Sequence, residues 1–104
     1  MIKIELTKRG CRLVKKDNIM PLREPQILPV IDAMLLLYVN KLKGLESNVI
    51  EVEPFLNVKR KGDKYIVNIL DNMFVVNEDE LLDLGDMVDM MYNEVFKEND
   101  KITD

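Results

Sequence analysis

The chain has 104 residues, 47% of them hydrophobic and 33% charged, with a formal net charge of −4. This length and composition are typical of a single globular domain, which we expect to cover residues 1–104. It contains no histidine and one cysteine, which excludes a histidine-dependent nucleophile, a disulfide within one chain and a cysteine-based zinc site. We therefore expect a protein that is not an enzyme, with no catalytic residues, no cofactor and no metal.

Apolar and polar side chains alternate over residues 2–7. This period of two is the pattern of a half-buried strand. A turn at residues 8–10 leads into a second apolar segment, residues 11–15, so the sequence predicts an N-terminal β-hairpin.

Prolines recur at Pro21, Pro25 and Pro29. Each lacks a backbone donor, so we expect the chain before Pro29 to be extended or turn-like. Pro29 itself suits the first turn of a helix, and we expect a helix from there to about Lys43, stopping at Gly44.

This central helix is apolar on almost every side. Such a helix needs cover around most of its circumference, which either the rest of the chain or a second copy can supply. A homo-oligomer is therefore one expectation, with complete internal burial as the alternative. The residues expected at a contact between copies are Leu35, Leu36, Leu37 and Val39.

Short strand signals follow in the middle of the chain. Residues 60–63 and 71–72 have the composition of tight turns, so the segments around them should pair in antiparallel fashion. The expected strands of this meander cover residues 49–53, 55–59, 64–70 and 73–76.

A second helix should begin after Asn77. The Asn77 side chain can accept from the first free amides, and Glu80 can reach back to the Asn77 amide, which is the capping-box pattern. We expect this helix to run to about Lys97, with residues 99–104 as a frayed polar tail. The fold class predicted is α+β: a hairpin, an apolar helix, a β-meander and an acidic helix, with both helices on one face of the sheet.

The second helix carries acidic residues opposite its apolar stripe. Leu82 and Met90 fall inside this acidic side, where a merely solvated helix does not need them. Apolar side chains among carboxylates are typical of a surface that binds a basic, partly apolar partner, although isolated surface hydrophobes are also ordinary. The residues predicted to bind a partner are Asp79, Leu82, Asp83, Asp86 and Met90.

Charge is divided along the chain, with seven cationic and two acidic side chains in residues 1–23 and eleven acidic and two cationic ones in residues 71–104. If the two hairpin tips lie at one end of one sheet, their cations form a strip for phosphates, with Tyr65 or Phe55 near enough to stack on a base. The alternative prediction is therefore a nucleic-acid-binding protein. Its candidate residues are Arg9, Arg12, Lys15, Lys16, Lys59, Arg60, Lys61 and Lys64.

The leading prediction is a non-catalytic protein-binding module: a small adaptor, inhibitor or assembly subunit with a basic protein partner. One version is a nucleic-acid mimic whose acidic helix occupies the basic groove of a nucleic-acid-handling protein. The longest apolar stretch, residues 33–39, is far short of the ~20 residues that span a bilayer, and the N-terminus lacks the apolar run of a signal peptide. We therefore expect a cytoplasmic protein without a membrane partner. The composition suggests a bacterial, bacteriophage or mobile-element origin. No internal repeat is visible in the sequence.

Overall fold

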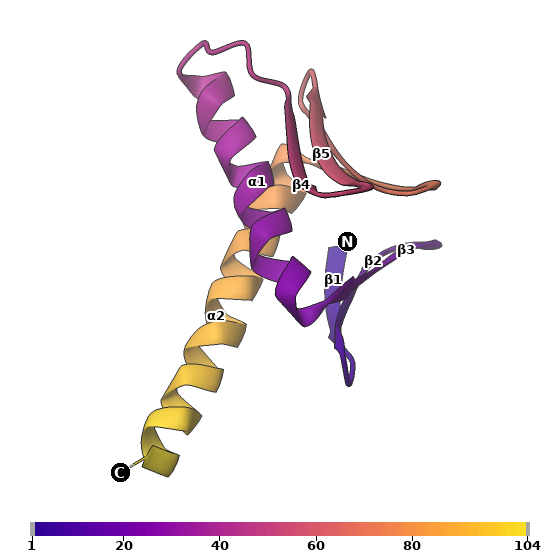
Figure 1. The fold of residues 1–104 in the computed structure, drawn as a ribbon. Helices are drawn as coiled ribbons and strands as arrows, with labels where there is room; N and C mark the ends of the chain where they lie inside the picture. The colour runs from indigo at the N-terminus through magenta and orange to yellow at the C-terminus, as the bar shows by residue number, and fades with distance from the viewer. Residues whose placement is uncertain (1, 104) are drawn as a thin grey trace.

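The computed structural model describes the backbone of residues 2–103 and the side chains of residues 2–93 (Figure 1). Seven strands and two helices follow one another within this range, and the helices pack against the sheets, which confirms the predicted α+β class. In chain order they are β1 (Ile2–Leu6), β2 (Gly10–Lys15), β3 (Asn18–Arg23), α1 (Glu24–Leu42), β4 (Val49–Glu53), β5 (Leu56–Lys61), β6 (Lys64–Ile69), β7 (Asn72–Asn77) and α2 (Glu78–Thr103).

The strands form two antiparallel sheets, β1-β2-β3 and β4-β5-β6-β7. The expected hairpin is confirmed and extended by β3, which contains Pro21. The Glu24 amide donates to the Arg9 carbonyl on the β2 side. In an antiparallel strand, the backbone amides that point to one neighbour occur at every second residue, so those of the even-numbered residues of β3 point to β2 and those of the odd-numbered ones point away. Pro21 therefore has its nitrogen on the free side of an edge strand, where a missing donor is tolerated.

Helix α1 begins at Glu24, so the expectation of an extended or turn-like chain before Pro29 was wrong for residues 24–28, although residues 18–23 are extended in β3. Pro25 lies in the first turn, where the amide has no intrahelical partner to lose. The Gln26 side chain accepts from the Arg23 amide at 2.9 Å and caps this end. The helix ends at Leu42, close to the predicted position.

Helix α2 begins at Glu78 behind the predicted cap. The Glu80 amide donates to the Asn77 side chain at 2.9 Å, and the Asn77 amide donates to Glu80 at 3.0 Å. The helix continues to Thr103, beyond the predicted end, through most of the segment expected to fray.

The chain contains an internal repeat that the sequence analysis missed. The order of three strands and a helix occurs twice, at an offset of 54 residues, as from Asn18 to Asn72. We call residues 2–42 the N-terminal unit and residues 56–103 the C-terminal unit. Strand β2 has the same bounds as β6 when shifted by this offset, and β3 has the same bounds as β7. The equivalent turn residues Lys16 and Leu70 both have positive φ values, 54° and 52°.

The buried positions of the two units also correspond. In the matched buried pairs the two residues always differ, but both are apolar and buried, so the hydrophobic pattern repeats without sequence identity at these positions. The matched buried pairs are Ile2 and Leu56, Cys11 and Tyr65, Leu13 and Val67, Met20 and Phe74, Leu22 and Val76, Ile27 and Leu81, Val30 and Leu84, and Met34 and Val88.

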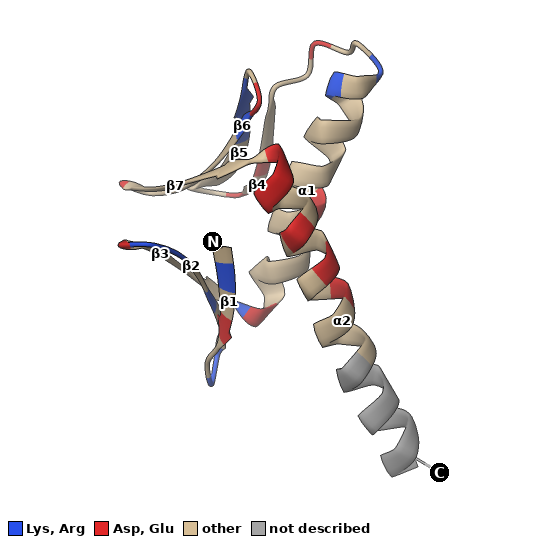
Figure 2. Cartoon of the chain, turned by 180° about the vertical axis from the view of Figure 1, so that it is seen from behind, with Lys and Arg blue, Asp and Glu red and all other residues tan. Residues whose placement is uncertain are grey.

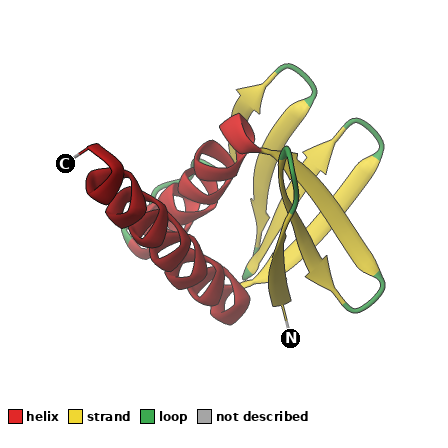
Figure 3. Ribbon diagram, turned by 90° about the horizontal axis from the view of Figure 1, so that it is seen from below, coloured by secondary structure: helices red, strands yellow, loops and turns green. Residues whose placement is uncertain are grey.

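Each helix contacts its own sheet and crosses onto the first strand of the other unit. Helix α1 packs against β5, and α2 packs against β1. Both helices lie on one side of the two sheets (Figure 3). The two units therefore share one hydrophobic core.

Strand β4 has no counterpart among the described residues of the N-terminal unit. It lies in the connection between the units and pairs with the outer edge of β5. The equivalent edge of β1 pairs with no strand in the part of the chain that the structure describes.

Candidate protein-binding surface

The residues predicted to bind a partner are all exposed on α2. We call Asp79, Leu82, Asp83, Asp86 and Met90 the acidic face. Figure 2 colours the ribbon red at all Asp and Glu positions along the first turns of α2. The Leu82 and Met90 side chains are 44% and 65% exposed. The predicted helix phase is confirmed by the burial of Leu81, Leu84 and Val88 on the opposite side.

Helix α1 carries a similar pattern at the equivalent positions. Its exposed Leu28, Asp32 and Leu36 match Leu82, Asp86 and Met90, so both helices place an acid between two exposed apolar side chains. The surrounding charge differs, because Pro25 and Pro29 of α1 stand where α2 has Asp79 and Asp83. The combination of apolar and strongly acidic character therefore belongs to α2.

Two other carboxylates of α2 face inward and hold the helix in place. Glu80 binds Lys15 of β2 at 2.7 Å, and Glu78 binds Lys41 of α1 and accepts from the Tyr65 hydroxyl at 3.4 Å. Asp79, Asp83 and Asp86, by contrast, form no ion pair with any residue whose side chain is described. The charge of the acidic face is therefore available to a partner.

The Glu80 carboxyl is held in its ionised form. Burial opposes ionisation, but the Asn77 amide and the Lys15 ammonium outweigh it, so the pKa of Glu80 lies below its ordinary value. A depressed pKa contributes stability above the unfolded pKa of about 4.3, and this contribution is lost as the pH falls through the folded value.

Replacing Glu80 by glutamine tests this ion pair. Glutamine keeps the cap, as Gln26 does at the equivalent position, but loses the charged bond to Lys15. We expect Glu80→Gln to lower the free energy of unfolding by about 1 kcal/mol at pH 7. In urea titrations the difference from the unmodified protein should shrink toward pH 3; a difference that stays constant with pH would show that ionisation is not its source.

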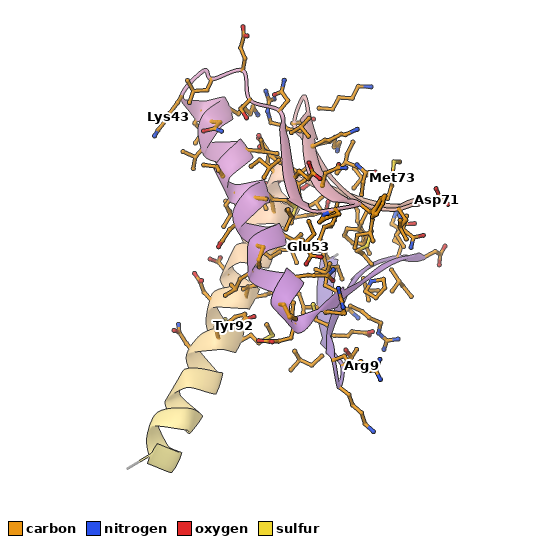
Figure 4. All side chains as sticks on the ribbon, in the orientation of Figure 1. Arg9, Lys43, Glu53, Asp71, Met73 and Tyr92 are labelled. Atoms are coloured by element: carbon orange, nitrogen blue, oxygen red, sulfur yellow. The ribbon has the colours of Figure 1, made fainter. Side chains whose placement is uncertain are left out.

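The basic hairpins do not form one strip, so that expectation was wrong. The β1–β2 and β5–β6 turns belong to different sheets and point in opposite directions (Figures 1 and 2); Arg9 marks the first of them in Figure 4. Lys15 binds Glu80, and Arg60 donates to the Gly62 carbonyl at 2.7 Å and to Asn48 at 2.8 Å. Arg12 is exposed and pairs with Glu5 at 3.2 Å. The remaining candidate cations are exposed: Arg9, Lys16, Lys59, Lys61 and Lys64.

The aromatic residues proposed for base stacking are in different environments. Tyr65 is 0% exposed, and burial together with Glu78 raises the pKa of its hydroxyl to about 12. It cannot stack on a base, because the core surrounds its ring. Phe55 is exposed next to β5.

Of the four residues expected at a contact between copies, two lie against the core and two are exposed. Leu37 is buried within the chain, and Leu35 packs against the core, where its side chain faces Gly85 of α2. Leu36 and Val39 remain exposed. The two sheets and α2 thus cover part of the apolar helix, and two of the four residues stay available to a second copy.

Sequence reasoning missed a groove between β1 and α2. It has a volume of about 290 Å³ and is lined by Ile4, Leu6, Met87, Met90 and Met91. No periodicity or motif indicates it, because it depends on how α2 crosses to the other unit. The groove borders the acidic face, and the two share Met90.

The described part of the chain holds no cluster of three or more His, Cys, Asp or Glu residues that could bind a metal ion. Within it, no helix is both long enough and apolar enough to cross a membrane. Burial raises the pKa of the Cys11 thiol to about 11, so this thiol is protonated at neutral pH and a poor nucleophile.

No protein-family model, curated protein or solved structure matches this chain. A functional assignment therefore depends on the surfaces of the chain itself.

Proposed function

We propose that the protein is a non-catalytic protein-binding module that docks a basic, partly apolar partner on its acidic face. The observation that carries this proposal is the exposure of Leu82 and Met90 among carboxylates that form no ion pair with any side chain of residues 2–93. A surface of this make-up fits an adaptor, an inhibitor or an assembly subunit, including one that mimics nucleic acid.

The two kinds of side chain contribute to different steps of binding. Charges attract a basic partner over several ångströms and set the rate of encounter, whereas apolar contact excludes water and sets the residence time. The helix that presents them is anchored by Glu78 and Glu80 to α1 and β2. A rigid surface loses little conformational freedom on binding, which favours affinity.

Direct nucleic-acid binding is the weaker proposal. Its cations lie on two sheets with turns that point in opposite directions, and three of the eight, Arg12, Lys15 and Arg60, are engaged within the chain. Phosphate binding by separated patches demands a ligand that wraps the molecule.

The test uses the partner recovered from the native host and measures its binding kinetics. We expect Asp83→Lys with Asp86→Lys to lower the association rate about tenfold at low salt, and Leu82→Ala to raise the dissociation rate about tenfold. The matched control is Leu28→Ala, at the equivalent position of α1, which should leave both rates unchanged.

Two results would contradict the proposal. One is a partner whose binding is insensitive to the acidic-face variants. The other is tight binding of mixed oligonucleotides at ~50 mM salt, with an affinity that falls steeply as salt rises, because such dependence indicates phosphate contacts.

A further inference from the structure

Strand β4 occupies a place in the C-terminal unit that no strand of the described residues takes in the N-terminal unit. It pairs with β5, with Ile50 opposite Val58 and Glu51 opposite Asn57, and it packs against α1. Ile50 and Val52 contact the core. In the N-terminal unit the equivalent place lies between β1 and α2, where the structure has the groove described above.

The backbone of β1 offers hydrogen bonds toward this place. In the C-terminal unit, the Arg60 amide donates to the Asn48 carbonyl at 2.7 Å, and Leu6 is the residue equivalent to Arg60. The Thr7 amide donates to Gly10 on the β2 side, and donors alternate along an antiparallel strand. The amides of Ile4 and Leu6 therefore point away from β2, toward the position that β4 takes in the other unit.

The side chains of the groove suit an apolar strand. Leu6 is 69% exposed, and Met87 and Met91 are half-buried beneath it. Figure 2 shows β1 as the strand of its sheet next to α2. Methionine side chains adapt their shape to an occupant, so a groove that contains three of them accepts varied apolar residues.

We propose that this groove binds an extended segment of a partner protein, which adds a strand to β1 as β4 adds one to β5. The inference rests on the proposed protein-binding function and names the form of the partner. A row of unpaired backbone groups beside an apolar groove is the arrangement that strand addition uses.

The repeat also specifies the side chains of the segment. Apolar residues at alternate positions would face the methionines of the groove, as Ile50 and Val52 of β4 pack against the core. Lys3 stands where β5 has Asn57, the residue opposite Glu51, so an acidic residue fits at that position. Glu53 of β4 accepts from Gln26 at 3.3 Å, but the residue equivalent to Gln26 is Glu80, so the segment should be uncharged there.

The experiment titrates the isotope-labelled full chain with a peptide of residues 47–54 that carries Glu53→Gln, followed by nuclear magnetic resonance. We expect saturable shifts of the Ile4 and Leu6 amides and of the methyl groups of Met87, Met90 and Met91. Leu6→Lys should weaken binding about tenfold, because an inward charge disfavours strand addition. Lys3→Glu should weaken it up to about fivefold. The control Met73→Lys, an exposed methionine of β7 away from the groove (Figure 4), should bind as the unmodified protein does.

We expect the peptide to bind with a Kd of ~1 mM or tighter. Absence of chemical-shift changes up to ~5 mM peptide would therefore overturn the proposal. So would a dimer in sedimentation that Leu6→Lys dissociates, because the occupant would then be a second copy. The proposed function fails separately: if the peptide binds but the acidic-face variants leave partner kinetics unchanged, the acidic face is not the docking surface. If those variants act as expected and the peptide does not bind, only the strand addition is wrong.

Discussion

Replacing Gly10 by alanine is expected to lower the free energy of unfolding by about 3 kcal/mol or more, a large fraction of the about 5–15 kcal/mol that stabilises an ordinary domain. A Cβ at this position would lie 2.1 Å from the Leu22 carbonyl oxygen and 2.7 Å from the Glu24 amide nitrogen. Both atoms belong to the junction of β3 and α1, which the bond from the Glu24 amide to the Arg9 carbonyl holds at 2.7 Å. Backbone on both sides must separate to admit a methyl group.

The matched control is Lys64, which occupies the equivalent position at the start of β6. Because this position already carries a side chain, Lys64→Ala should change the free energy of unfolding by less than about 0.5 kcal/mol. Urea titrations followed by circular dichroism measure both variants. A Gly10→Ala protein as stable as the unmodified one would mean that the β3–α1 junction is looser than the structure shows.

Leu84→Ala should lower the free energy of unfolding by about 3 kcal/mol. Leu84 is fully buried at the centre of the shared core, and truncation there loses the burial of its methyl groups and leaves a cavity. Leu82→Ala, two residues away on the acidic face, should cost less than about 1 kcal/mol, because Leu82 is partly solvated in the folded state.

The two leucines together test the orientation of α2. For each variant we would measure the free energy of unfolding, by heat or urea, and the affinity for the partner. We expect Leu84→Ala to lose stability and Leu82→Ala to lose binding. The opposite assignment, with Leu82→Ala markedly unstable and fully active in binding, would place the acidic face in the core.

Local signals in the sequence predicted much of the fold. The turns around Gly62 and Asp71 define the hairpins of the second sheet, and the cap at Asn77 and Glu80 defines the start of α2. These features depend on residues close in sequence, and a hairpin turn or a helix cap forms from its own side chains. The exposure of Leu82 and Met90 followed from helical periodicity for the same reason.

Features that depend on distant residues were not predicted. The prolines predicted only an extended or turn-like chain around Pro21, and the pairing of β3 with β2 depends on its position at a sheet edge, where a proline is acceptable. The division into two sheets and the repeat stayed hidden because paired core positions share apolar character but rarely identity, as Cys11 and Tyr65 illustrate. The groove beside β1 depends on a strand that one unit has and the other lacks.

The crossed helices give this single chain the architecture of a dimer. Two separate copies of a three-stranded unit with one helix would form the same core by laying each helix across the other copy's first strand, related by a two-fold axis. Here residues 43–55 join the two units covalently, so the units can carry different residues at equivalent positions, as Cys11 and Tyr65 show. The asymmetry of the protein is concentrated in that connection, because it contributes β4 to one side only.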